Sequence, residues 1–336
     1  MCATIPSMRS KRQSPSLALR PTIDFHGERI RSMPADTTFS VIVTSYNYRA
    51  FVAEAVDGVL AQTRMPLDII VVDDGSTDGS PDLLRERYGS DPRVTVLCVA
   101  NGGQLSAFVH GLEHARGEVV CFLDSDDHWS ADYLQKIAEI YDNRAEVDFI
   151  VSDMQVFGDE QRVIGYGPQA VDFGYTAIST FVTACWYGAP TSALSMRRRW
   201  ARESLDLPPH FLERWKLSAD NCLVYGSSVL GARKLFLPTG SVHYRIHGKN
   251  GWWANRSATL TYANRLHSRV LIDHYAGVVG LGAWAMELAK LEYRTKPQPS
   301  WRETRRYASI SMRGNAPWWR RVEQALSVLG DRIRKH

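Results

Sequence analysis

Apolar and polar positions alternate along the first half of the chain in blocks that predict strands and helices in turn. Four short apolar runs rich in β-branched residues predict buried strands, namely 39–43, 67–72, 94–99 and 119–123. Apolar residues at helical spacing follow each of them, in 51–60, 81–87, 105–115 and 133–140. This alternation predicts an α/β fold whose parallel sheet is covered by helices on both faces.

Three of the predicted strands end in polar side chains. The first is followed by residues 44–47, which read TSYN, the second by the turn 73–80, which reads DDGSTDGS, and the fourth by 124–127, which reads DSDD. In an open α/β sheet, ligands bind outside the carboxyl ends of the strands. We therefore expect one cleft that the three strand ends share.

The DSDD turn brings together three carboxylates, those of Asp124, Asp126 and Asp127. Like charges at such close spacing raise one another's pKa and destabilise the fold unless a cation or an array of donors neutralises them. Mg²⁺ and Mn²⁺ prefer oxygen ligands and, when bound by one or two carboxylates, keep positions for substrate phosphates. A turn in which aspartates cap the next helix explains the same residues, and the pattern alone leaves both interpretations open.

The order of these motifs resembles glycosyltransferase family 2, a large family of inverting enzymes. Five segments carry the resemblance: 40–63, 71–80, 117–129, 218–237 and 242–250. It implies the GT-A nucleotide-diphospho-sugar transferase fold, an α/β fold with a Rossmann-like mixed sheet flanked by helices. Beyond the matching segments, we expect a helical C-terminal extension.

On this resemblance we expect four parts of the chain. Residues 1–37 form a basic segment rich in Ser, Pro and Arg, which we expect to be disordered and which is no signal peptide. Residues 38–130 form the nucleotide-sugar-binding half and 131–255 the acceptor-binding half. Residues 256–336 form the helical extension, rich in basic and aromatic side chains.

The resemblance implies that a nucleoside diphosphate sugar lies across the strand ends. Thr44, Tyr46 and Asp74 match positions that hold the nucleobase, and Asp73 would support them by accepting hydrogen bonds from turn amides. An aromatic ring can stack on a base, and a carboxylate can accept the N–H of a uracil-type base. A UDP-linked donor is therefore expected.

The DSDD turn matches the Asp-x-Asp motif of the family in two frames. In one frame Asp124 lies near the ribose and Asp126 binds Mn²⁺ or Mg²⁺; in the other, Asp126 takes the ribose and Asp127 the metal. His247, in the segment YRIHGKN, matches a position that can complete the metal site. Both frames remain open, and Asp126 belongs to the site in each.

Asp220 matches the general base of the family, the aspartate that deprotonates the acceptor hydroxyl. A glutamate usually precedes this aspartate, but Ala219 stands there, and the helix after Gly103 lacks the usual basic residue. Asp220 as a helix N-cap is the alternative for this residue. For the whole protein, the alternative to a metal-dependent inverting enzyme is a catalytically silent nucleotide-sugar-binding protein.

Acceptor recognition is expected from aromatic side chains in the second half. Trp186 and Tyr187, and also Trp252, can form platforms for a sugar ring, although packing in the core explains the first two equally well. The acceptor implied by the resemblance is a glycan or a lipid-linked glycan, in the synthesis of a cell-surface polysaccharide or glycoconjugate.

Composition adds the expected location. Five scattered cysteines fit reduced thiols of a cytoplasmic protein, and no apolar run is long enough to cross a bilayer. In 297–336, tryptophans and arginines predict either a helix lying on the inner face of the membrane or a helix packed on the catalytic domain. The basic excess, +4 overall, lies in the tails without a nucleic-acid motif, so nucleic-acid binding is not expected.

Overall fold

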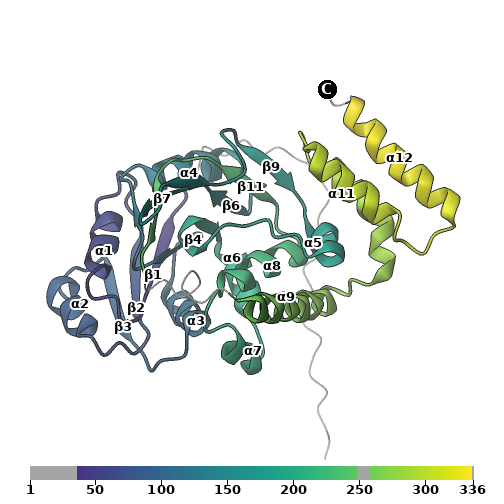
Figure 1. Cartoon of the computed structure of the whole chain (residues 1–336). Coiled ribbons are helices and arrows are strands. Elements are labelled where there is room, and N and C mark those ends of the chain that lie inside the picture. The colour runs from purple at the N-terminus through teal and green to yellow at the C-terminus, as the bar shows by residue number, and fades with distance from the viewer. Residues whose placement is uncertain (1–35, 249–256, 335–336) are drawn as a thin grey trace, which may run out of the picture. The chain divides into compact units, whose positions relative to one another are not determined.

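The computed structural model describes residues 36–248 and 257–334 (Figure 1). Residues 34–336 belong to one compact unit. Trp252, one of the predicted acceptor residues, and residues 1–35 of the segment expected to be disordered lie outside the described residues. The last two residues of that segment are ordered, contrary to the expectation: Asp36 pairs with Arg64 at 3.1 Å, and the amide of Thr37 donates to Asp142 at 2.8 Å.

A mixed sheet of eight strands forms the centre of the fold, in the order β3-β2-β1-β4-β10-β6-β11-β9. The first four strands along the chain run parallel to one another, β10 is antiparallel to both of its neighbours, and β9 is antiparallel to β11. The bounds are β1 Phe39–Ser45, β2 Asp68–Asp73, β3 Val94–Cys98, β4 Val119–Asp124, β6 Phe149–Ser152, β9 Val171–Gly174, β10 Leu194–Arg197 and β11 Lys234–Leu237. The predicted Rossmann-like mixed sheet is confirmed.

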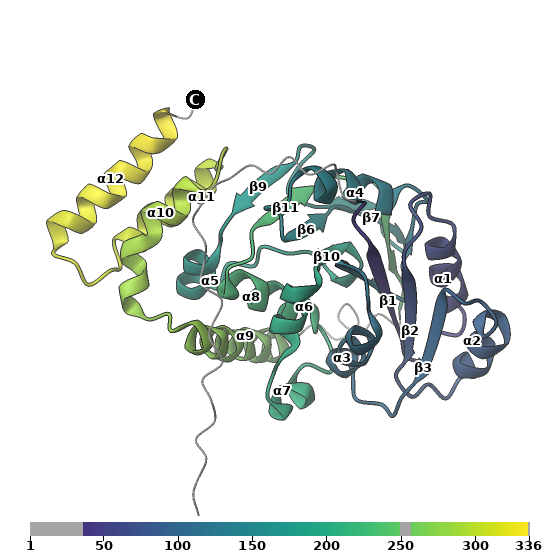
Figure 2. The same ribbon diagram turned by 180° about the vertical axis from the view of Figure 1, so that it is seen from behind.

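Helices cover the sheet on both faces, and every residue of β1 and β2 is buried, as expected of parallel strands between two helical layers. On the face seen in Figure 2, α3 packs on β1 and β2, and α6 packs on β4 and β10. The helices around the sheet are α1 Val52–Leu60, α2 Ser80–Tyr88, α3 Gln104–His114, α4 Tyr133–Asn143, α5 Ala177–Thr183, α6 Arg198–Leu205, α7 Pro209–Arg214, α8 Asp220–Leu230 and α9 Ala258–Val279.

A second, smaller sheet has the order β5-β12-β7-β8. Its strands are β5 His128–Trp129, β7 Met154–Gly158, β8 Arg162–Ile164 and β12 Val242–Ile246. Strand β12 is antiparallel to β5, which directly follows the DSDD turn. This pairing places the YRIH segment, which belongs to the last of the five segments that resemble the family, beside the end of β4.

The C-terminal extension is helical, as predicted. Within the predicted range 256–336, however, α9 packs in the main hydrophobic core. The remaining part, to which the name C-terminal extension is kept below, consists of η2 Ala283–Leu288, α10 Ala289–Arg294, α11 Trp301–Ser311 and α12 Trp318–Arg334. With α5 it forms a second hydrophobic cluster around Tyr293 and Tyr307, separate from the main core. Glu292 attaches the extension to α5, because its carboxylate accepts hydrogen bonds from the amides of Ile178 and Ser179 at 2.8 and 3.0 Å.

None of the helices within 36–248 and 257–334 combines the length and the apolar character that a bilayer span requires. The main hydrophobic core runs without interruption across the boundary expected at residue 130, since β4 pairs with β10. The two expected halves therefore share one core.

Candidate active site

Strand register brings the polar strand ends together. Thr44 on β1 lies opposite Asp124 on β4, and Ser45 lies opposite Asp73 on β2. The Thr44 hydroxyl donates to Oδ1 of Asp124 at 3.2 Å. The edge of the sheet at the carboxyl ends of β1, β2 and β4 is thus one continuous polar surface.

Within the DSDD turn, Asp127 serves to hold the turn in place. Its side chain is almost fully covered, with 1% exposure. One carboxylate oxygen accepts the Ser192 hydroxyl at 2.5 Å and the other accepts the backbone amide of Arg245 at 2.8 Å. Asp127 therefore ties the end of β4 to the short helix η1, Thr191–Ala193, and to β12.

Asp126 faces a different set of groups. Its exposure is 8%, and Nε2 of His247 lies 3.1 Å from Oδ2 of the carboxylate. The His247 ring is held between Phe51 and Tyr48, with ring centroids 5.1 and 5.7 Å away. Burial, and then the charge of Asp126, raise the pKa of the Tyr48 hydroxyl, so this phenol stays protonated beside the turn.

Burial, together with the neighbouring negative charge, raises the pKa values of the other two acids. Burial, and then the neighbouring Asp126, raise the pKa of Asp124 to about 7, although hydrogen bonds from Gln104 and Thr44 oppose the shift. The same two causes raise the pKa of Asp127 above its ordinary range. Hydrogen bonds from the Ser192 hydroxyl and the Arg245 amide oppose the shift at Asp127, and a cation at the end of β4 would favour the ionised carboxylates further.

A divalent ion at this turn would need several oxygen or nitrogen ligands. In the part of the chain that the structure describes, no three His, Cys, Asp or Glu side chains form a complete metal site. The donors present are Asp126 and His247, with the charge of Asp124 nearby. Mg²⁺ and Mn²⁺ are often held by one or two protein groups together with substrate phosphates. The donor set fits an ion that is shared with a phosphate-bearing substrate.

At the end of β2 the two aspartates have separate contacts. Asp73 accepts the amide of Ser76 at 2.9 Å, a turn contact of the kind expected for it, and its second oxygen is buried without a described partner. Asp74 accepts the amides of Gly102 and Gly103, each at 2.8 Å. Asp74 therefore fixes the loop that leads into α3.

Gly103 has to be a glycine. Its φ is +86°, and a Cβ at this position would lie 2.5 Å from the backbone of Lys216. Thr44 is buried beneath this surface, whereas the ring of Tyr46, two residues further along the chain, is exposed. The loop and Tyr46 thus border an open surface above the ends of β1 and β2.

Asp220 is the first residue of α8. Ala219 occupies the N-cap position and no side chain caps this helix, so the alternative of Asp220 as an N-cap is wrong. One oxygen of Asp220 accepts the amide of Asn221 at 2.9 Å. Burial raises the pKa of Asp220 to about 7, against the effect of this hydrogen bond.

Gln104, the first residue of α3, joins three elements of the site. Its Nε2 donates to Oδ1 of Asp124 at 2.9 Å and to the Thr191 hydroxyl at 3.1 Å. Its Oε1 accepts the amide of Ala219 at 2.9 Å, directly before Asp220. No sequence signal pointed to this role, because the partners lie 20, 87 and 115 residues away.

Arg245 is likewise committed to contacts within the protein. Its Nε donates to the backbone carbonyl of Asp126 at 2.9 Å, and its Nη2 pairs with Glu54 at 2.5 Å. The guanidinium also lies over the rings of Phe157 and Phe51, at 4.5 and 4.9 Å from their centroids. Arg245 therefore braces the DSDD turn against α1.

The predicted acceptor residues differ in position. Tyr187 is 2% exposed, its ring packs on Phe173 with centroids 5.4 Å apart, and its hydroxyl donates to Glu303 of α11. A ring covered in this way has no free face for a sugar, so the platform role predicted for Tyr187 is wrong. Trp186 is half-buried, and its indole N–H is buried without a partner among the described residues.

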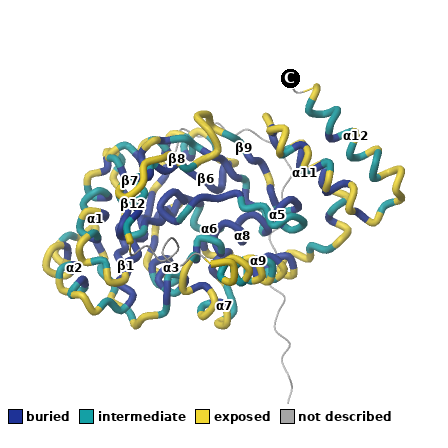
Figure 3. Tube along the Cα trace, viewed as in Figure 1, coloured by how far each residue is buried: buried dark blue, intermediate teal, exposed yellow. Residues whose placement is uncertain are grey.

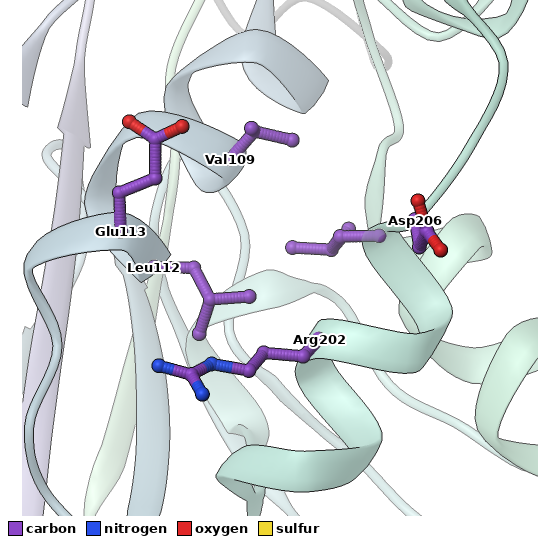
Figure 4. A pocket seen from close by; sticks show the side chains of 6 residues that line it. Val109, Leu112, Glu113, Arg202 and Asp206 are labelled. Atoms are coloured by element: carbon purple, nitrogen blue, oxygen red, sulfur yellow. The ribbon is translucent and has the colours of Figure 1, made fainter. Parts of the chain in front are cut away.

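A depression of about 290 Å³ lies elsewhere, between α3 and α6 (Figure 4). Its walls are Val109, Leu112, Glu113, Arg202, Leu205 and Asp206. None of the strand-end carboxylates lines it. The candidate active site is therefore the polar edge of the sheet and not this depression, because the sheet edge carries Asp124 and Asp126 together with the motif residues around them.

The mixed sheet and its carboxylate-bearing strand ends define a GT-A glycosyltransferase. The chain belongs to glycosyltransferase family 2: the model of that family, described as glycosyl transferase family 2, matches residues 40–202. An uncharacterised glycosyltransferase of Nostoc sp. is 32% identical over 266 residues, 76% of this chain and 80% of the relative. The predicted family and enzyme class are confirmed.

Two further comparisons match either a shorter segment of the chain or the fold at lower identity. TuaG of Bacillus subtilis, named a putative teichuronic acid biosynthesis glycosyltransferase, is 41% identical over 107 residues, which are 32% of this chain and 42% of TuaG. The crystal structure of S. aureus TarS residues 1–349 with UDP-GlcNAc aligns with a TM-score of 0.54 and 17% identity, over 89% of this chain and 72% of that one. The TarS likeness shows the fold alone.

Proposed function

We propose that this glycosyltransferase moves a sugar from a nucleoside diphosphate donor to a glycan or lipid-linked acceptor, with inversion at the anomeric carbon. The observation that carries the proposal is the position of Asp220. This single carboxylate, with its pKa near 7, begins α8 directly after Ala219, whose backbone amide donates to Gln104, and Gln104 in turn donates to Asp124 on the donor-side strand.

Asp220 supplies the general base. A base works best when its pKa lies close to the pH at which it operates, and burial provides that match. As the acceptor oxygen forms its bond to the anomeric carbon, its proton passes to Asp220 and the carbon–oxygen bond to the diphosphate breaks. One displacement on the face opposite the leaving group inverts the configuration, and it needs no second carboxylate nucleophile.

Asp126 and His247 would hold Mn²⁺ or Mg²⁺, with Asp124 close by. Of the two motif frames, the contacts favour the one in which Asp126 is the ligand, because both oxygens of Asp127 are already used inside the protein. When bound, the ion would neutralise charge on the leaving diphosphate. Tyr48 and Phe51 hold the His247 ring at this position.

The open surface above β1 and β2 would take the nucleobase. Tyr46 offers an exposed ring for stacking, and Thr44 and Asp74 lie at the strand ends below it. The fold likeness to TarS, described with UDP-GlcNAc, agrees with a uracil-containing donor. The name of TuaG supports an acceptor in cell-surface polysaccharide synthesis.

A donor screen tests the proposal. Purified full-length protein is incubated with common nucleotide sugars and candidate acceptors, with Mn²⁺, with Mg²⁺ or with chelator, and nucleotide release is measured. We expect release from a UDP-sugar that depends on acceptor and on metal, and an inverted linkage in the product. Binding of donor without transfer to any acceptor would instead support the silent binding protein.

A further inference from the structure

Helix α12 carries an apolar face that the rest of the described chain does not cover. We call Trp318, Trp319, Val322, Leu326, Leu329 and Ile333 the α12 stripe; at 100° per residue they share one side of the helix. Exposures of 69% for Trp318, 61% for Leu326 and 70% for Ile333 show that this side is open. Figure 3 shows α12 mostly in the colours of intermediate and exposed residues.

The opposite side of α12 holds the helix in place. Val328 is the one buried residue of this helix and belongs to the second hydrophobic cluster. Asp331 pairs with Arg294 at 2.7 Å, and Arg321 donates to the Met312 carbonyl at 3.1 Å. The stripe therefore points away from the helices that anchor α12.

Positive charge surrounds the stripe. Residues 301–334 contain eight arginines and three acidic residues, a net charge of +5. Arg320 and Arg334 are exposed on the polar side of α12, and Arg332 lies over the ring of Trp301, 5.7 Å from its centroid. Of the three acids, Asp331 and Glu303 are already paired with arginines within the extension.

We propose that the α12 stripe docks on the surface of an anionic lipid bilayer, with the helix lying in the interface. Tryptophan side chains favour the interface between headgroups and acyl chains, and arginines beside them attract anionic headgroups. A helix of 17 residues, about 26 Å long, can lie flat and bury such a stripe.

Positive charge disfavours two other partners for the α12 stripe, a second copy of the chain and the N-terminal residues 1–35. In a symmetric dimer formed through α12, two extensions of +5 would face one another with few acids left to pair. Residues 1–35, which lie outside the described chain, contain six basic and two acidic residues and so have the same sign. Only a negatively charged partner complements both the apolar stripe and its surroundings.

The test is flotation of full-length protein with vesicles of phosphatidylcholine alone or mixed with phosphatidylglycerol. We expect binding to the anionic vesicles that weakens as salt rises. The pair Trp318→Ser and Leu326→Ser should lower the partition coefficient at least tenfold, since it removes two inserted side chains. Arg320→Gln and Arg334→Gln should each lower it about fivefold.

Matched control variants distinguish binding through the α12 stripe from nonspecific adsorption to vesicles. Tyr262→Ser removes an equally exposed aromatic ring on α9, and Arg214→Gln removes an exposed charge on α7; neither should change partition. Sedimentation without lipid tests self-association. A wild type that ignores anionic vesicles, stripe variants that bind unchanged, or a dimer that the stripe variants dissociate would each overturn the proposal.

Vesicle binding requires neither donor nor catalysis. Its failure would therefore leave the proposed transfer reaction intact, and failure of the donor screen would leave the docking surface intact.

Discussion

At the start of α8, the Asp220 carboxylate has lost most of its contact with water, and burial raises its pKa to about 7. The same burial has two effects. It makes the group a competent base near neutral pH, and it makes the charged form costly to the fold. A change of this one side chain should therefore affect both turnover and the stability of the folded protein.

We expect Asp220→Asn to lower turnover by about 10²–10⁴-fold, the range of a positioned general base, with donor affinity nearly unchanged. In the wild type, turnover should rise as pH increases through about 7, because the deprotonated carboxylate is the active form. Steady-state rates from pH 5.5 to 9 and a donor titration measure both effects. Asp273→Asn, an exposed aspartate on α9, is the control. Unchanged turnover in Asp220→Asn would remove this residue from the mechanism.

The same substitution, which should lower turnover, should raise the stability of the folded protein above neutral pH. The pKa of Asp220 is about 7 in the folded protein and 3.8 ordinarily, so between these pH values the native protein binds more protons than the unfolded chain. The contribution of Asp220 to stability therefore falls as pH rises from about 4 to about 7. Asparagine keeps an oxygen for the Asn221 amide and carries no charge. Melting temperatures should therefore be higher for Asp220→Asn than for wild type at pH 8 and similar at pH 4.

Single residues show where prediction from sequence stops. The DSDD turn and Asp220 were identifiable because the motif and the chemistry agree. The contacts of Asp127 were not, because its partners lie 65 and 118 residues away. Tyr187 failed as a platform for the same reason: its covering residue Glu303 lies 116 positions further on.

Among the elements, prediction was best where strands are long and uniformly apolar. The run 39–43 became β1, Phe39–Ser45, and the helical pattern 105–115 became α3, Gln104–His114. In the second half, β6, β10 and β11 have four residues each, too few for a periodic pattern. Their antiparallel and parallel pairings depend on tertiary contacts that no local signal encodes.

Gln104 joins three of these elements, so its removal should affect the geometry of the reaction more than binding. Gln104→Leu leaves the Ala219 amide and Asp124 without this partner, and we expect turnover to fall about tenfold or more with a smaller change in KM for the donor. Gln135→Leu, an exposed glutamine on α4, is the control. A loss confined to donor affinity, with turnover unchanged, would mean that Gln104 acts on binding alone.

For the whole molecule, a cation would favour the ionised form of the carboxylates clustered at the end of β4, so nucleotide and metal should stabilise the fold together. We expect UDP and Mn²⁺ combined to raise the melting temperature by more than the sum of their separate effects, since each completes the site of the other. Asp126→Ala should abolish this excess, whereas Asp82→Ala, an exposed acid on α2, should retain it. Additive shifts in the wild type would contradict a shared ion.

The hydrogen bonds from α5 to Glu292 limit how the C-terminal extension could be exchanged between related proteins. The C-terminal extension begins after the last segment that resembles the family, which suggests a part that could be exchanged between relatives. Yet Glu292 accepts the first amides of α5, and α5 ends eight residues before Thr191, a partner of Gln104. A chimera that exchanges residues 280–336 alone would leave this helix end without its acceptor. An exchange that preserves the reaction has to carry α5 with it.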